Sequence, residues 1–193
     1  MAINVARIKT VSDTLWAVVT PEGYQPVPGD YPTTGDFVRN GRDRAFKVAQ
    51  ENGGGLIPFS DAQCLCPITQ NQQYICQGAN YVSHMLEAGL DPNQKGYNMI
   101  FRKASSCLAP ADTDIIRPDH VSLLDYELEL GLVLARDITG PKTVSEDTLD
   151  QFVAGLVITN DVSARCVQIP QMQFYKGKSY RTFGPTGPLV DAS

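Results

Sequence analysis

The sequence lacks the features of membrane and secreted proteins. Its 193 residues contain no apolar run of the roughly 18 residues that a membrane-spanning helix needs. The N-terminal segment MAINVARIKTVSD has no basic stretch followed by a long apolar core, so we expect no signal peptide. The five cysteines are an odd number, which favours reduced thiols over a disulfide framework. We therefore expect a cytoplasmic protein.

The sequence also lacks an excess of basic residues. It has 16 Lys and Arg against 21 Asp and Glu, a net charge of −5. This balance does not favour a nucleic acid or an anionic membrane as a partner. The chain is long enough for one good-sized core, or for one small and one medium domain, and it shows no internal repeat.

Several common catalytic motifs are absent. The sequence has no HExxH zinc motif and no GxSxG nucleophile elbow. KGKS at 176–179 does not complete a phosphate-binding loop, because Met172 stands where that loop needs a glycine. No CxxC pair or nearby histidine completes a zinc site around Cys64, Cys66 and Cys76. We expect these cysteines to be small buried hydrophobic residues.

The first 65 residues predict a small N-terminal α/β domain. INVARIKTV, TLWAVVT and GYQPVP are typical of short strands separated by turns. FVRNGRDRAFKVAQENGGG is predicted to form one helix that ends at the glycines.

Residues 66–193 predict a second, strand-rich domain, so the fold class is α+β and β-rich. YICQGAN is expected to be a strand that leads into a short helix, YVSHMLEAGL. SEDTLDQFVAGL is expected to be a helix with Ser145 at its N-cap. VITND is predicted to be an apolar strand that ends on Asp161.

The segment LLDYELELGLVLA at 123–135 alternates strictly between two faces for ten residues. Asp125, Glu127 and Glu129 fall on one face, and tyrosine and leucines fall on the other. Residues two apart on a strand face are about 6.5–7 Å apart, so two carboxylates there can share one hard cation. An ordinary solvated strand face is the alternative interpretation. We expect the leucine face to pack in the core.

Asp161 supplies a possible third oxygen ligand at the end of its strand, although a capping aspartate would give the same pattern. Two glutamates and one aspartate select Mg²⁺, Mn²⁺ or Ca²⁺ over zinc. The pattern alone leaves open whether these three acids form such a set, and it leaves the role of Asp125 open.

Three further residues could take part in catalysis. His84 and Glu87 lie three positions apart on a predicted helix, where a carboxylate can orient an imidazole as a general base. Such pairs are also common on helix surfaces. Lys178 could stabilise a developing oxyanion in a cleft.

Taken together, these segments resemble the fumarylacetoacetate hydrolase superfamily. The order and spacing match its catalytic domain over about residues 66–190. The resemblance is carried by CQGANYVSHMLEAG, IFRKASSCL, IIRPDHVSLLDYELELGLVLARDI, VAGLVITNDVSAR and KGKSYRTFGPTGPLV.

The resemblance implies a mixed β-sandwich roll with a small N-terminal α/β domain at 1–65, and usually a homodimer. It implies that Glu127, Glu129 and Asp161 bind a divalent metal, Mg²⁺ or else Mn²⁺ or Ca²⁺. It further implies site roles for six residues: His84 and Glu87 would activate water, Lys178 would bind substrate oxygens, and Arg165, Gln168 and Lys103 would bind substrate.

The implied activity is hydrolysis of a carbon–carbon bond in a β-diketo acid or acylpyruvate through an enolate. Alternatives on the same fold are decarboxylation of a 2-oxo acid such as oxaloacetate, and dehydration of a sugar acid. Two departures bear on this. Cys166 stands where the family usually has an acid, and family members continue for roughly another hundred residues past GPLV. An inactive fragment or a non-catalytic binding subunit is therefore a further alternative.

Overall fold

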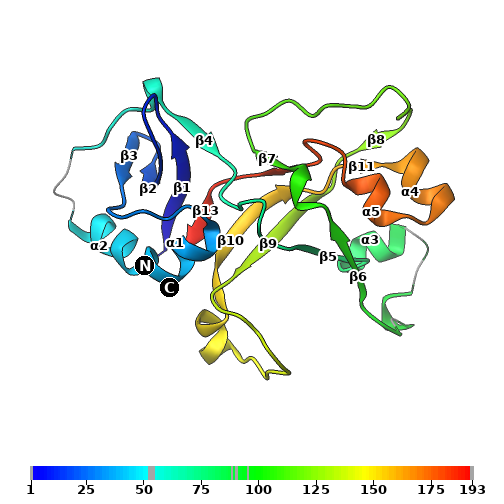
Figure 1. Cartoon of the computed structure of the whole chain (residues 1–193). Helices are drawn as coiled ribbons and strands as arrows, with labels where there is room; N and C mark the ends of the chain where they lie inside the picture. Colours follow the sequence, from blue (N-terminus) through cyan, green and yellow to red (C-terminus); the bar gives the residue numbers. More distant parts are fainter. Residues whose placement is uncertain (1, 52–54, 88, 90, 95, 192–193) are drawn as a thin grey trace.

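A computed structural model of the chain describes residues 2–51, 55–87, 89, 91–94 and 96–191 (Figure 1). Its largest element is a nine-stranded sheet with the strand order β3-β2-β1-β13-β10-β12-β7, to which β4 adds at β1 and β9 adds at β10. All of these pairings are antiparallel except β12 with β7. The strands are β1 (Ile3–Lys9), β2 (Thr14–Thr20), β3 (Gly23–Pro26), β4 (Gln63–Leu65), β7 (Leu108–Pro110), β9 (Leu128–Leu134), β10 (Val153–Asn160), β12 (Gly184–Thr186) and β13 (Leu189–Asp191).

The N-terminal strands pack on two short helices, α1 (Thr34–Asn40) and α2 (Arg42–Glu51). The prediction of one continuous helix here was wrong, because Gly41 interrupts it. A Cβ atom on Gly41 would lie 2.6 Å from the Phe37 ring, so only glycine allows the chain to turn this closely. The three strands predicted in this region are confirmed as β1, β2 and β3.

Aromatic residues hold the core between these helices and the sheet. The Trp16 and Phe37 rings stack with centroids 4.2 Å apart, and the Trp16 indole donates to the Tyr31 carbonyl at 3.0 Å. Both stacked rings are almost fully buried. The ring stacking and the hydrogen-bonded indole N–H together hold β2 against α1.

The remaining elements surround the far half of the large sheet (Figure 1). Two two-stranded antiparallel sheets lie there with three short helices. They are β5 (Tyr74–Gly78) with β6 (Met99–Lys103), β8 (Leu124–Asp125) with β11 (Ser163–Ala164), and the helices α3 (Val82–Glu87), α4 (Arg165–Gln171) and α5 (Phe174–Lys178). The described ranges also contain four short 3-10 helices: η1 (Phe59–Asp61), η2 (Pro92–Gln94), η3 (Ser105–Cys107) and η4 (Glu146–Gln151). Ser145 caps η4 as predicted, but the segment forms a 3-10 helix instead of the expected α-helix.

The acidic segment 123–135 differs from its prediction in two ways. It forms two strands, β8 and β9, which are separated at Tyr126 and Glu127. The leucine face of β9 is not in the core: its leucines are 52–70% exposed, while Glu129 and Val133 face inward. Strict alternation shows that the two faces differ, but it does not show which face is covered. The leucine face comprises Leu128, Leu130, Leu132 and Leu134.

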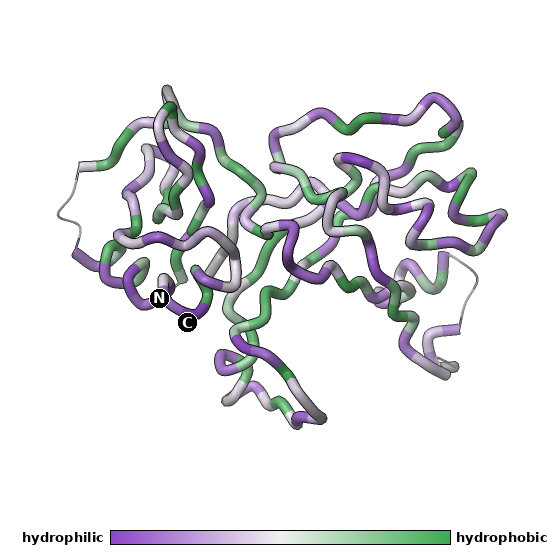
Figure 2. Tube along the Cα trace, viewed as in Figure 1, coloured by the Kyte–Doolittle hydropathy of each residue, from purple (hydrophilic) through white to green (hydrophobic). Residues whose placement is uncertain are grey.

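The division into two domains near residue 65 stays a prediction. It falls between β4 and β5, but β13 pairs with both β1 and β10, so one sheet joins the two parts. Hydrophobic segments run along the strands on both sides of this division (Figure 2). None of the helices in the described ranges is long and apolar enough to cross a membrane.

Candidate active site

Lys178 lies at the centre of a buried cluster of charged side chains. Its ammonium donates to Glu127 Oε2 at 2.8 Å, to Asp161 Oδ2 at 2.8 Å and to the Ser163 hydroxyl at 2.7 Å. All three N–H donors of the ammonium are therefore used. The Lys178 side chain is 2% exposed, so its charge is tolerated because it is paired on two sides.

Lys103 lies beneath the same aspartate. Its fully buried ammonium lies 2.5 Å from Asp161 Oδ1 and 2.7 Å from the Phe183 carbonyl oxygen. Each Asp161 oxygen thus accepts from a different lysine. In this arrangement Lys103 holds Asp161 in place, and its substrate contact, predicted from the resemblance, stays a prediction.

Local backbone geometry brings these residues together. Asp161 directly follows β10, and its N–H donates to the Glu127 carbonyl at 2.8 Å. The Glu127 N–H in turn donates to the Asn160 side chain at 3.1 Å. The interruption between β8 and β9 is therefore what points Glu127 toward Asp161.

Close packing of α4 against α5 positions Lys178. A Cβ atom on Gly177 would lie 2.7 Å from Gln168 Cβ and 2.9 Å from its backbone nitrogen. Glycine at 177 allows the two helices to approach, and the next residue then reaches the cluster.

Arg165 forms the outer wall of the cluster. It donates through Nε to Asp125 Oδ2 at 2.9 Å and through Nη1 to Gln168 Oε1 at 2.8 Å. Its Nη2 lies 2.9 Å from Asp125 Oδ2 and 2.6 Å from Glu127 Oε1. Partial burial lowers the pKa of Arg165, but the Glu127 and Asp125 carboxylates outweigh it and raise the pKa overall. The two predicted substrate-binding residues, Arg165 and Gln168, thus lie beside the acidic strand.

Glu129 is partly buried on the inward face of β9. Burial raises the pKa of its carboxyl group, the neighbouring Glu127 and Asp161 carboxylates raise it further, and a hydrogen bond with the Tyr81 side chain opposes them. The three predicted metal ligands are therefore close enough to repel one another.

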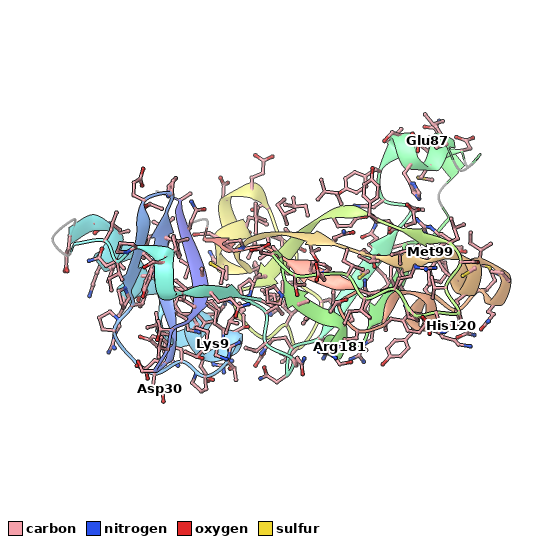
Figure 3. The ribbon with its side chains drawn as sticks, turned by 90° about the horizontal axis from the view of Figure 1, so that it is seen from above. Lys9, Asp30, Glu87, Met99, His120 and Arg181 are labelled. Carbon is pink, nitrogen blue, oxygen red and sulfur yellow. The ribbon has the colours of Figure 1, made fainter. Side chains whose placement is uncertain are left out.

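The predicted dyad is not joined to this cluster. His84 and Glu87 are both exposed on α3, which projects from one side of the molecule in Figure 3, where Glu87 is labelled. Among the described side chains, no hydrogen bond or ion pair links either residue to the cluster or to the other. Tyr81, which directly precedes α3, is the neighbour whose hydroxyl lowers the pKa of Glu129.

Sequence reasoning missed Ser163 and left Asp125 unassigned. Ser163 Oγ lies 3.3 Å from Glu127 Oε1 and accepts a hydrogen bond from Lys178. It lies two residues after Asp161 in the quoted NDVSAR segment, so its position in a strand after the aspartate was the available signal.

The residues fit a divalent cation by donor type. Three carboxylates suit Mg²⁺ or Mn²⁺, and positive charge would offset the repulsion that raises the pKa of Glu129. In the part of the chain that the structure describes, however, no group of three or more His, Cys, Asp or Glu side chains is arranged to hold a metal ion. The Lys178 ammonium lies between Glu127 and Asp161, so a cation there requires Lys178 to shift.

Two thiols near the cluster are held in their neutral form. Burial raises the pKa of Cys76 to about 12 and that of Cys107 to about 11. Burial likewise raises the pKa of the Tyr74 hydroxyl, which hydrogen-bonds with Thr159 at 2.8 Å. All five cysteines are free.

Comparison with known proteins identifies the family. Residues 73–193 match the family model for the fumarylacetoacetate (FAA) hydrolase C-terminal domain. This chain belongs to the fumarylacetoacetate hydrolase family. The resemblance read from the sequence and the predicted fold class are both confirmed.

Named relatives of this family cover most of the chain. The chain is 35% identical over 147 residues to oxaloacetate tautomerase fahd2, mitochondrial, of Xenopus laevis, covering 75% of this chain and 44% of that protein. It is 34% identical over 149 residues to oxaloacetate tautomerase YisK of Bacillus subtilis, covering 76% and 48%. The chain therefore spans about half the length of these relatives.

A solved structure shows the same fold. Fumarylacetoacetate hydrolase from psychrophilic Exiguobacterium antarcticum superposes with a TM-score of 0.72 at 25% identity. The match covers 97% of this chain and 66% of that chain.

Proposed function

We propose that this chain acts, as part of an enzyme, on a small 2-oxo or 1,3-dicarbonyl acid through the enolate of that acid. The supporting observation is the buried Lys178 ammonium, which lies among Glu127, Asp161 and Ser163. When a metal ion takes the place of the ammonium between Glu127 and Asp161, Lys178 would shift and its N–H donors would become available. A cation in such a poorly solvated site stabilises a developing oxyanion more strongly than water does.

The carboxylates would bind a metal ion, and Arg165 would bind the substrate. Glu127, Glu129 and Asp161 would hold Mg²⁺ or Mn²⁺, which supplies Lewis-acid polarisation of the substrate oxygens. Arg165 offers a guanidinium beside Glu127 for a substrate carboxylate, and its side chain is 18% exposed. Glu127 is 22% exposed whereas Lys103 and Lys178 are almost fully buried, so substrate would approach from the Glu127 and Arg165 side.

The first candidate reaction is hydrolysis of a carbon–carbon bond in an acylpyruvate. His84, oriented by Glu87, would remove a proton from water while the resulting hydroxide adds to a carbonyl carbon. The carbon–carbon bond would then break, its electron pair would leave as the enolate of the 2-oxo acid, and that carbon would take up a proton. This reaction requires α3 to move toward the cluster, because His84 does not contact it in this structure.

The second candidate is interconversion of the keto and enol forms of oxaloacetate. Two observations favour it: the relatives named above are oxaloacetate tautomerases, and His84 and Glu87 lie apart from the cluster. In this reaction a base removes a proton from C3 and the oxygen on C2 gains one, so no water molecule is consumed. Lys178 would stabilise the oxygen at C2 in both candidates.

One panel of substrates tests these candidates. Turnover of acylpyruvates, fumarylpyruvate and oxaloacetate by the full chain would be measured with Mg²⁺ or Mn²⁺, together with Glu127→Ala and His84→Ala. Loss of all activity in Glu127→Ala is expected, and unchanged turnover would refute the site. Hydrolysis that disappears in His84→Ala supports the first candidate, whereas oxaloacetate tautomerisation that survives His84→Ala supports the second. Ligand binding without turnover of any substrate would show a non-catalytic binding subunit.

We further propose that two copies pair through the leucine face of β9, which Ile158 of β10 extends at 54% exposure. Exposed side chains of this size offer on the order of 100 Å² each. Two such uncharged faces would bury about 1,000 Å² in all, near the lower bound for a specific interface. Light scattering should show a dimer that Leu130→Glu dissociates. Leu86→Glu, at a leucine on α3 that is 61% exposed against 52% for Leu130, is the matched control and should leave the dimer intact.

A cytoplasmic location is also proposed. Its support is that all five cysteines are free, as expected for a protein in a reducing compartment.

A further inference from the structure

Asp125 has two distinct contacts, one for each carboxylate oxygen. Its Oδ1 accepts from the Tyr126 backbone N–H at 2.9 Å, where the chain leaves β8. Its Oδ2 accepts from Arg165 at Nε and lies equally close to Nη2, 2.9 Å from each. The carboxylate thus ties the turn before Glu127 to one edge of the guanidinium.

Backbone hydrogen bonds fix the positions of Asp125 and Arg165 relative to each other. In the β8–β11 ladder Asp125 lies opposite Ser163, and the Arg165 N–H donates to the Leu123 carbonyl at 2.9 Å. The guanidinium therefore starts from a fixed backbone position, and Asp125 sets the plane in which it lies.

Arg165 transmits this orientation to the acidic site. Its Nη2 is shared between Asp125 Oδ2 and Glu127 Oε1, at 2.9 Å and 2.6 Å. Because the Asp125 and Glu127 carboxylates share one guanidinium, Arg165 neutralises the charge of Glu127 less than it would without Asp125. Glu127 Oε2 remains directed at the centre of the cluster, toward Lys178.

We infer that Asp125 is a positioning residue that acts through Arg165 to keep Glu127 oriented toward the cluster for cation binding. This inference rests on the proposed metal-dependent function. Without the Asp125 charge, Arg165 pairs with Glu127 alone and competes with the cation.

The test is a double-mutant cycle read by Mn²⁺ binding to the full chain in isothermal titration. Asp125→Asn should weaken Mn²⁺ binding roughly three- to thirtyfold, and Asp125→Glu should restore most of it. In an Arg165→Gln background, Asp125→Asn should change the Kd less than about twofold, because its effect passes through the arginine.

Asp36→Asn is the matched control. Asp36 is also paired with an arginine, Arg39 at 3.3 Å, and its side chain is 33% exposed against 43% for Asp125. It lies in α1, outside the site. Both variants should lower the thermal midpoint by a similar small amount, but only Asp125→Asn should weaken Mn²⁺ binding.

The outcomes separate this inference from the function on which it rests. No Mn²⁺ binding by the unmodified chain would overturn the proposed metal site and this inference together. Binding that Glu127→Ala abolishes but that Asp125→Asn and Asp36→Asn leave equally unchanged would overturn the positioning role alone. An undiminished effect of Asp125→Asn in the Arg165→Gln background would also overturn it.

Discussion

Replacement of Lys103 by methionine should destabilise the fold more than any change at an exposed lysine. The Lys103 side chain is 0% exposed and Asp161 is 4% exposed, so their ion pair lies in a poorly solvated interior. Methionine keeps the apolar stem but leaves Asp161 Oδ1 and the Phe183 carbonyl without their donor. Loss of one partner of a buried pair typically costs about 3–5 kcal/mol, and we expect about 3 kcal/mol because Lys178 still pairs with Asp161.

Thermal unfolding followed by circular dichroism measures this loss. For a chain of this size each kcal/mol shifts the midpoint by about 2–4 °C, so Lys103→Met should lower it by about 6–12 °C. Lys176→Met is the control, because Lys176 is exposed and its ammonium donates to the exposed Gln171 side chain at 2.9 Å. Equal midpoints for the two variants would refute the buried pair in solution.

Three further predictions concern thiols, metal and core. Hydrogen bonds to the Leu123 backbone and to Ser122 lower the pKa of Cys166, whereas burial raises that of Cys76 to about 12. Iodoacetamide near pH 8 should therefore modify Cys166 first, with a rate profile shifted to lower pH than an ordinary thiol, and mass spectrometry should find Cys76 labelled only after unfolding. Chelation with EDTA should abolish activity but lower the thermal midpoint by a few degrees at most. The reason is that Lys178 and Arg165 already pair with the Glu127 and Asp161 carboxylates without a metal ion. Global unfolding on chelation would contradict this. Trp16→Phe should cost about 2 kcal/mol in urea unfolding, because the indole loses its bond to the Tyr31 carbonyl and part of its stacking; a loss below about 0.5 kcal/mol would argue against that packing.

Local pattern was sufficient for several strands. The three N-terminal strands and β5 are present where alternation and apolar runs predict them. The predicted strand VITND is the second half of β10, whose first half, from Val153, was wrongly predicted to be helical. These strands depend on side-chain periodicity within one segment, and that periodicity can be seen in the sequence itself.

Breaks within elements could not be predicted in the same way. The single predicted helix is divided at Gly41 because Phe37 packs against that backbone. The acidic strand is divided at Glu127 because the backbone there pairs with Asn160 and Asp161, which are distant in sequence. Both breaks are consequences of tertiary contacts.

The sequence alone determined which residues could form the site: acids two apart on a strand, a later aspartate and a lysine near a glycine. Tertiary structure alone decided their arrangement, with Lys178 between Glu127 and Asp161. It also decided that the leucine face of β9 is exposed and that His84 lies apart from the acids. The physical reason is that residue type and spacing set chemistry and local conformation, whereas burial, charge pairing and face selection depend on segments that meet only in the folded chain.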